Sequence, residues 1–304
     1  MKNLLRPLAF LLGLPFLVQL VYSEDINAFK PRFSLKLAAG LISAGSLGDV
    51  NDGLESFNSN EVFESLRKSY RLIGQIQTLD NQAFDWEAEI RFNLTARIGF
   101  GIAVAAPFHT HNKSSVTYTY GDRNTSTWTF KPEVRVFFPI RMSAYYTLSF
   151  IPRLSISIGG GVGVYPSKIA QFIRWDETYQ DEKYWATWDQ EAKRDFALGY
   201  HGTAALEYIL NHRFAVIAEF QARYVKIGNF KGKEAGPDVW GGEYDVNGTL
   251  YFYSGRNTII GTSYARLRIF EEPVPDDPSL VGLREAVLDL SGFSLRIGLR
   301  MKLF

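Results

Sequence analysis

Strict two-residue periodicity over residues 84–94 is the feature that most restricts how this chain folds. Apolar residues stand at every even position, and the odd positions between them hold Asp85, Glu87, Glu89, Arg91 and Asn93. Because successive side chains of a strand point to opposite faces, one face of this segment is apolar and the other almost wholly charged. A helix would mix the two sets on every face, so the segment is predicted to be a β-strand.

The same alternation recurs along the chain and predicts an all-β fold. The eight predicted strands cover residues 33–41, 84–94, 98–106, 140–150, 154–164, 196–208, 214–224 and 293–303. Each is close to the roughly 9–11 residues that a tilted strand needs to cross a membrane. The apolar phase of the fourth strand runs back from Phe138 to Trp128, which predicts that this strand projects beyond the membrane. Pro132 and Pro139 are expected to bend it or to mark an exposed edge.

The connections between the predicted strands alternate in length. Residues 95–97, 151–153 and 210–213 form tight turns, whereas 43–83, 107–126, 166–195 and 229–287 form long polar connections. An even number of strands with short turns at one end and long extracellular loops at the other is typical of a closed antiparallel transmembrane β-barrel. Counting 249–253 and 259–269 as spanning would give ten strands. Four consecutive aromatic or apolar residues at 250–253 favour an extracellular hairpin there instead.

The first residues have the layout of an export signal. Lys2 and Arg6 precede an apolar run from Leu8 to Val21, and Ser23 offers a small residue before a cut. The run is short for a spanning helix, which needs about 20 apolar residues. We therefore expect a signal peptide at 1–23, a barrel domain at 24–304, and export to the bacterial outer membrane of the cell envelope.

Composition excludes several other classes. The sequence has no cysteine, so it has neither a disulfide framework, a thiolate metal site nor a lipid-modified N-terminal cysteine. With 33 basic and 32 acidic side chains, the net charge of +1 gives no general attraction to nucleic acid. We find no phosphate-binding glycine loop, serine elbow or zinc signature, and we predict no cofactor.

Taken together, these segments resemble the small bacterial outer-membrane β-barrel family, of which the barrel of outer membrane protein A is an example. The resemblance rests on the eight alternating segments, on the turn at 152–155 that leads into the glycine-rich 158–163, and on 290–298 before the end. It implies contact with outer-membrane lipid and recognition of Phe304 by the barrel assembly machinery. Phe304 falls in the inward phase of the last strand, unlike the family's terminal aromatic. Family members range from tethers and adhesins to narrow channels and a few lipid-modifying enzymes, so the fold does not select a function.

The predicted inward face is dense in charge. An eight-stranded barrel has a lumen that side chains about fill, and buried charges are generally paired. We therefore expect an occluding network of acids and bases rather than an open conduit. Its predicted members are Asp85, Glu87, Glu89, Arg91, Arg141, Glu207, Glu219, Arg223, Arg296 and Arg300. Small residues on two strands, among them Gly159, Gly161 and Gly163, are expected to make room for long side chains.

The remaining candidates are histidines and aromatic loops. His109 and His111 share a strand face and are expected to be a solvent-exposed pair, whereas His201 is expected to be buried and satisfied by a carboxylate. Aromatic residues crowd the long connections, with Trp175, Trp185 and Trp188 in 166–195. They are expected to form small cores under folded loops, or else a sugar- or protein-binding surface for an extracellular ligand.

Three function classes follow from these patterns. The first is a non-enzymatic barrel with a structural, binding or surface-interaction role. The second is a porin-like narrow channel for small solutes. The third is an enzyme that acts on lipid or peptide at the outer rim. The sequence favours the first and predicts no catalytic residue, because no nucleophile, base and orienting group stand together.

Overall fold

A computed structural model describes residues 32–59, 71–120, 124–237, 242–257, 262–272, 274 and 277–303. The predicted signal peptide at 1–23 and the predicted assembly signal Phe304 lie outside the described residues. Among the described residues, no helix is long and apolar enough to span a membrane.

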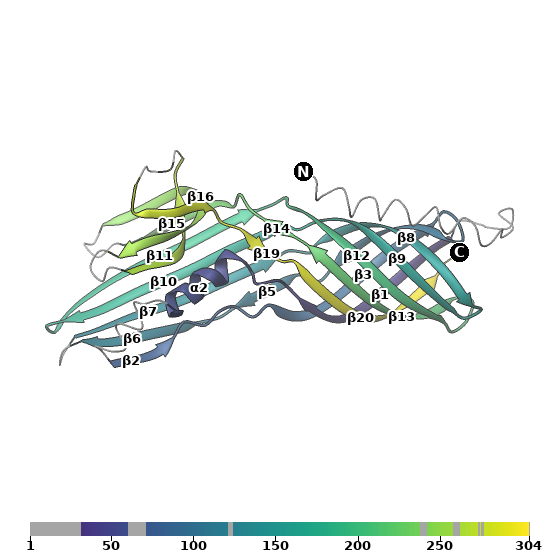
Figure 1. Ribbon diagram of the computed structural model, residues 1–304, viewed down its shortest axis with the longest axis horizontal. Coiled ribbons are helices and arrows are strands. Elements are labelled where there is room, and N and C mark those ends of the chain that lie inside the picture. The colour runs from purple at the N-terminus through teal and green to yellow at the C-terminus, as the bar shows by residue number, and fades with distance from the viewer. Residues whose placement is uncertain are drawn as a thin grey trace.

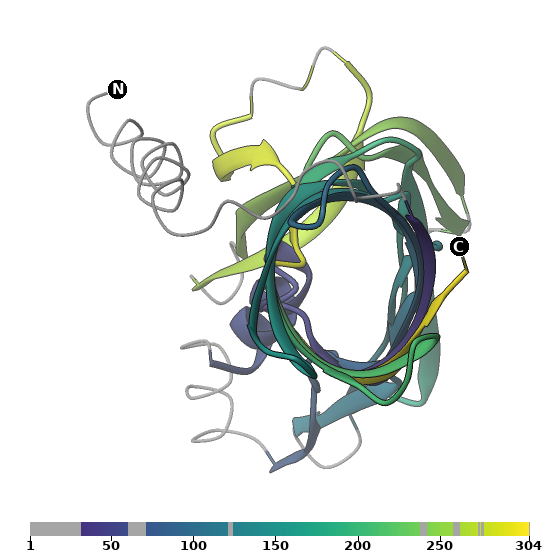
Figure 2. The ribbon, with the colours of Figure 1, turned by 90° about the vertical axis from the view of Figure 1, so that its right-hand side faces the viewer.

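Eight antiparallel strands close into a barrel, in the order β1-β20-β13-β12-β9-β8-β4-β3. Figure 2 looks along this ring of strands. Its members are β1 (Arg32–Ser43), β3 (Gln82–Asn93), β4 (Ile98–Ala105), β8 (Ile140–Ile151), β9 (Leu154–Val164), β12 (Leu198–Ile209), β13 (Phe214–Tyr224) and β20 (Gly292–Lys302). All eight predicted strands are confirmed, and β1 pairs with β20 to close the ring.

Tight turns join β3 to β4, β8 to β9 and β12 to β13 at one end of the barrel, as predicted. The start of β1 and the end of β20 meet at this same end, where Ser34 is the partner of Lys302. The predicted hairpin at 249–269 forms outside the barrel, from β16 (Glu243–Asn257) and β17 (Thr262–Phe270). The barrel therefore has eight strands and not ten.

The four long connections fold into a second body beyond the other end of the barrel (Figure 1). Most of it is a ten-stranded sheet, called here the outer sheet. Its strands are β2 (Arg71–Gln75), β5 (Phe108–His111), β6 (Ser114–Tyr120), β7 (Asn124–Val136), β10 (Ser167–Tyr179), β11 (Glu182–Arg194), β15 (Lys231–Pro237), β16, β17 and β18 (Leu280–Glu285). A short pair, β14 (Lys226–Ile227) with β19 (Leu288–Asp289), lies where the chain leaves β13 and returns to β20.

The two bodies have opposite polarity. On the barrel, apolar side chains point outward, and Leu41 and Ile297 are 69% and 70% exposed. On the outer sheet, Val134 and Ile169 are buried on the inner face, while Lys168 and Glu191 form an ion pair of 2.6 Å on the outer one. A hydrophobic belt around the barrel suits lipid, and a charged outer face suits water. The change of polarity therefore marks one boundary of the membrane belt.

This inversion corrects the prediction that the fourth barrel strand simply continues back to Trp128. The segment at 128–136 belongs to β7 of the outer sheet, and Val134, Val136 and Phe130 are buried instead of facing lipid. The break falls at residues 137–139, which lie between β7 and β8. Pro139 has no backbone N–H to give to a sheet ladder, so the two strands separate there and the inward phase changes from even to odd residues.

One helix, α2 (Asp49–Ser59), follows β1 and packs on the inner face of the outer sheet. Val50 and Leu54 face the apolar core, and the Phe57 ring lies 4.8 Å from the Phe130 ring of β7. Asp49 fixes the start of the helix, because its carboxylate accepts the backbone N–H of Val287 at 2.7 Å and pairs with Arg284 at 2.5 Å. The helix thereby fills the space that the curved sheet encloses.

Gly159 and Gly163 make room for large side chains, as predicted, whereas a Cβ atom at Gly161 would meet the backbone of Met142 and Ser143. A Cβ atom at Gly159 would overlap the ring of Tyr145 and lie 2.8 Å from the carbonyl oxygen of Ala144. Tyr145 needs this space because its ring stacks against Arg91, whose guanidinium carbon lies 3.5 Å from the ring centroid. Gly159 thus allows a large aromatic side chain to reach the charges of the lumen.

We predict that Gly159→Val destabilises the barrel by about 1–3 kcal/mol, the usual cost of overpacking a filled interior. The matched control is Gly202→Ala, since its new Cβ would point outward and meet its nearest atom at 3.9 Å. Urea unfolding followed by heat-modifiable gel mobility measures both. Equal stability of the two variants would contradict this account of Gly159.

Candidate functional sites in the barrel lumen and the outer sheet

A cluster of fully paired charges occupies the middle of the lumen. Lys36 lies 2.6 Å from a carboxylate oxygen of Glu87 and 2.6 Å from one of Glu219. Arg296 reaches the same two carboxylates at 2.9 and 2.6 Å, and Asp85 at 3.2 Å. The register explains the contacts, because Glu219 on β13 stands directly opposite Arg296 on β20. All five side chains are at most 3% exposed, so each charge depends on the others.

A second group of contacts extends this cluster around the barrel wall. Arg91 donates to Glu89 at 3.0 Å, and the hydroxyl of Tyr145 donates to the same carboxylate. Arg141 forms an ion pair with Glu87 and donates a hydrogen bond to Gln221. Lys36 also lies 3.3 Å from Glu89 and so joins the two groups. Eight inward charged side chains, with Tyr145 and Gln221, thus form one network, here called the lumen network.

Two predicted members lie toward the ends of the lumen. Arg300 is 3.3 Å from the Glu207 carboxylate. The Arg223 guanidinium instead donates to the carbonyls of Leu290 and Ser43 and to the Ser294 hydroxyl at 2.8–3.0 Å. All ten predicted residues therefore face the lumen, but Arg223 serves to tie β13 to β20 and β1 at the outer rim.

The outer end of the lumen is closed by an apolar layer. Phe108, Val136, Tyr165 and Leu290 are each at most 5% exposed and belong to the core that fills the outer sheet. A cavity of about 30 Å³ remains between this layer and the charges of Asp85, Arg141 and Arg223. Such a cavity has room for water but not for an open conduit. The buried side chains of the lumen network and of this apolar layer thus occupy the inside of the barrel.

His109 and His111 are exposed, as expected, with ring centroids 4.9 Å apart. His201 differs from the expectation in its partner. His201 is buried but accepts or donates a 2.7 Å hydrogen bond with the Ser143 hydroxyl, not with Glu207, and its Nδ1 has no partner in the described structure. A Ser–His pair without an orienting third group, sealed in a filled lumen, lacks the arrangement of a nucleophilic site. His109 lies 3.2 Å from Glu133, which the sequence did not place beside it. The described residues contain no group of three or more metal-ligating side chains.

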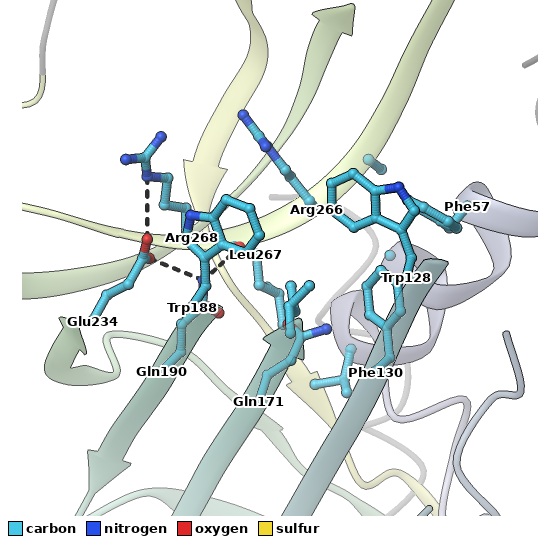
Figure 3. Close-up of a pocket in the computed structure, with 14 residues that line it drawn as sticks. Phe57, Trp128, Phe130, Gln171, Trp188, Gln190, Glu234, Arg266, Leu267 and Arg268 are labelled. Atoms are coloured by element: carbon cyan, nitrogen blue, oxygen red, sulfur yellow. Dashed lines mark hydrogen bonds and ion pairs between the residues drawn. The ribbon is translucent and has the colours of Figure 1, made fainter. Parts of the chain in front are cut away.

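The outer sheet holds a second site, a pocket of about 60 Å³ between α2, β17 and the inner face (Figure 3). Its aromatic wall comes from Trp128, Phe130 and Trp188 with Phe57 of α2. The Trp128 and Trp188 rings are nearly parallel, with planes inclined by 9° and centroids 6.0 Å apart. The prediction that loop aromatics form a small core under folded connections matches Trp175 and Trp188, which both pack against Trp128 of β7. Trp185 is 48% exposed on the other face.

A polar row crosses the otherwise apolar inner face beside this wall. Gln171, Gln190 and Glu234 are register partners on the neighbouring strands β10, β11 and β15. Glu234 is 1% exposed, and one of its oxygens accepts from the Gln190 amide at 2.9 Å and from the Ile269 N–H at 3.0 Å. Arg268 lies 3.4 Å from the other oxygen. Burial raises the pKa of the Glu234 carboxyl, and these hydrogen bonds and Arg268 offset this only in part.

Sequence reasoning missed the polar row because residues 166–195 were treated as irregular. The signal was partial: Ile169, Ile173 and Trp175 share one phase, and Lys168, Arg174 and Asp176 share the other together with Ala170 and Phe172. Two polar glutamines within apolar phases obscured the pattern. Their cross-strand alignment with Glu234 depends on register, which one sequence does not give.

The closed antiparallel barrel, apolar outside and charged inside, is the fold of a small outer-membrane β-barrel. A solved structure similar to it is the crystal structure of the outer membrane protein OprG from Pseudomonas aeruginosa, with 10% sequence identity, a TM-score of 0.37, and coverage of 92% of this chain and 99% of the OprG chain. No protein-family model matches the sequence, and no curated protein matches it significantly. Because the TM-score is below 0.5, the class rests on the barrel's own closure, strand order and two-faced pattern.

We predict that Arg296→Ala destabilises the barrel by roughly 3–5 kcal/mol, because removing one partner leaves buried carboxylates uncompensated. Three acids lose a partner at once. Lys193→Ala is the control: Lys193 pairs with Glu191 at the surface, with its own side chain 56% exposed, and no measurable change is expected. Urea unfolding in detergent compares them, and a fully stable Arg296→Ala barrel would contradict the pairing argument.

We predict that Glu234 makes the outer sheet less stable as pH rises above 4.5, its ordinary pKa. A carboxyl whose folded-state pKa is raised contributes stability below its unfolded pKa and loses it as pH passes the folded value. Glu234→Gln should remove this part of the pH dependence. Hydrogen bonds from Lys168 and Lys193 lower the pKa of Glu191. Glu191→Gln should therefore change the pH dependence of stability in the opposite direction. Unfolding followed by tryptophan fluorescence from about pH 4 to 8, which covers the ordinary glutamate pKa and the range above it, tests both. Equal slopes of stability against pH for the wild type and Glu234→Gln would refute the prediction.

Proposed function

We propose that this chain is a non-conducting barrel of the bacterial outer membrane that anchors a binding body, the outer sheet, at the cell surface. The single observation that supports this most is the closed lumen. The lumen network fills its middle, and the apolar layer around Phe108 and Tyr165 covers its outer end. Such a barrel serves as an anchor better than as a porin-like channel.

The orientation follows from the connections. Outer-membrane barrels have short periplasmic turns and longer extracellular connections. The three tight turns of this barrel lie opposite the outer sheet, which supports a position of the sheet outside the cell. Outer-membrane lipid then surrounds the belt that includes Leu41 and Ile297. Export through a cleaved segment at 1–23, and handling by the barrel assembly machinery through Phe304, stay predictions of the sequence.

The proposal assigns the chain no catalytic role and no cofactor. A binding role fits the outer sheet, because its inner face combines the aromatic wall of Trp128 and Trp188 with the buried polar row of Gln171, Gln190 and Glu234. Pockets that bind ligands are typically concave and mostly apolar, with a few convergent polar groups.

We predict that the wild-type protein gives no stable conductance in planar bilayers. Single-channel recording is the measurement, with an open porin of known conductance incorporated the same way as the positive control. Stable, reproducible ohmic steps from the wild type would refute the anchor and favour a narrow channel.

Insertion and orientation are checked on intact cells, using the absence of native cysteine. A single cysteine at Tyr179, which is 44% exposed where β10 turns into β11, should react with a membrane-impermeant maleimide. The matched variant His212→Cys lies in the exposed tight turn between β12 and β13 and should react only after lysis. Reversed labelling would overturn the proposed orientation.

A further inference from the structure

The pocket of the outer sheet has an unmet hydrogen-bonding requirement. The Gln190 amide nitrogen donates to Glu234 and, at 3.3 Å, to the Leu267 carbonyl. These two bonds fix the orientation of the side chain, which is 5% exposed. The amide oxygen, Oε1, is buried without a partner in the described structure. A buried acceptor left unpaired costs about 1–3 kcal/mol, so native proteins rarely keep one without water or a ligand to fill it.

The neighbouring groups define what can meet this acceptor. Gln171 lies between Gln190 and Phe130 and lines the pocket (Figure 3). Its amide offers both donors and an acceptor. A ligand that suits the row therefore carries hydroxyl or amide hydrogens to donate to Gln190 and oxygens to accept from Gln171.

The aromatic wall sets a second requirement. Trp128 and Trp188 present ring faces beside the polar row, and the register places Trp188 opposite Ile173 on β10, one step along from the Gln171–Gln190 pair. An indole face is apolar and rigid, so it favours a flat ligand surface of C–H groups. A ligand that meets both requirements therefore carries hydrogen-bonding groups on the edge of a ring and C–H groups on the face of the same ring.

Charge excludes one ligand class. The charged lining consists of the Glu234 carboxylate and the guanidinium groups of Arg266 and Arg268. Glu234 already pairs with Arg268 at 3.4 Å, so the lining has no excess negative charge to attract a cation. An aromatic cage for an ammonium group needs the opposite balance. A neutral or acidic ligand is favoured.

We propose that this pocket binds a saccharide, with a sugar ring edge inserted beside Gln171 and Gln190 and a C–H face against Trp188 and Trp128. This inference names the ligand class of the binding role proposed above and rests on it. The cavity of about 60 Å³ takes only part of one ring, so the remainder of an oligosaccharide lies at the partly enclosed mouth. The same chemistry is offered by a free oligosaccharide and by the glycan of a surface glycolipid.

The test uses full-length protein in a zwitterionic detergent without a sugar headgroup, since a maltoside would compete for the site. Maltotriose, cellotriose, chitotriose and trigalacturonate are titrated separately by calorimetry, and lipopolysaccharide micelles form a second arm. We expect saturable binding of at least one probe. Trp188→Ala should weaken it by about tenfold or more, which corresponds to the loss of one good stacking contact, and Trp188→Phe should recover part of the affinity.

Trp185→Ala is the matched control, because Trp185 stands on the same strand, is 48% exposed and stacks with Arg174 on the outer face. It should bind as the wild type does. Gln190→Leu, which removes the unpaired acceptor, should weaken binding, and near-wild-type thermal unfolding of each variant is required for its titration to count. Where a variant unfolds early, Gln171→Leu replaces it.

The outcomes separate the possible sources. Trp188-dependent binding of a free trisaccharide assigns the site to soluble glycans, and such binding of micelles alone assigns it to a membrane-borne glycan; both support the proposal. Absence of binding in both arms, or equal loss in Trp185→Ala and Trp188→Ala, overturns it. The anchor proposal is tested separately, by the absence of conductance and by labelling of the outer sheet on intact cells. The saccharide proposal can therefore fail while the anchor proposal stands.

Discussion

Pairing of charges in a space that excludes water is the constraint on which the rest of this structure depends. Lys36 and Arg296 share the carboxylates of Glu87 and Glu219, so four strands are held in one register by side chains rather than by backbone bonds alone. A slip of one residue would turn these charges toward lipid and the apolar belt toward the lumen. The network is costly to break and therefore specifies the barrel closure, with Gly159 leaving the room that Tyr145 needs to join it.

The same pleated strand pattern is used twice, in opposite environments. In the barrel the outward face meets lipid and is apolar, whereas in the outer sheet the outward face carries ion pairs such as Lys168–Glu191. Between β9 and β10 the inward phase is kept, from Gly163 through Tyr165 to Ile169, and only the chemistry of each face changes. Because of this change, the same antiparallel strands can continue from the membrane into water. A single apolar layer, which includes residues of α2, closes the outer end of the lumen.

The two candidate sites differ in what surrounds their polar groups: opposite charges in the lumen, and an aromatic wall in the outer sheet. In the lumen, carboxylates and bases meet one another, and the residual space has room for water but not for an open conduit. In the outer sheet, Glu234 is bound by Gln190, Ile269 and Arg268, but Gln190 keeps an unpaired oxygen beside an aromatic wall. A lumen filled by ion pairs suits an anchor, even though single nitrogen atoms of Arg91, Arg141 and Arg296 have no hydrogen-bond partner among the described residues. An unpaired acceptor in a pocket beside Trp188 suits a ligand. For this reason we assign the anchor role to the barrel and the binding role to the outer sheet.

The sequence by itself determined the eight barrel strands, their tight turns and the inward position of all ten predicted charges, because two-residue alternation reports which face each side chain takes. It also placed the hairpin at 249–269 outside the barrel. Tertiary structure decided the rest. The apolar residues of 128–136 face inward because the strand breaks at 137–139 and because they pack into the core of the outer sheet. Which charges pair, and that Gln171, Gln190 and Glu234 line up across three strands, are set by the register between segments far apart in sequence. Periodicity within one strand carries no information on that register.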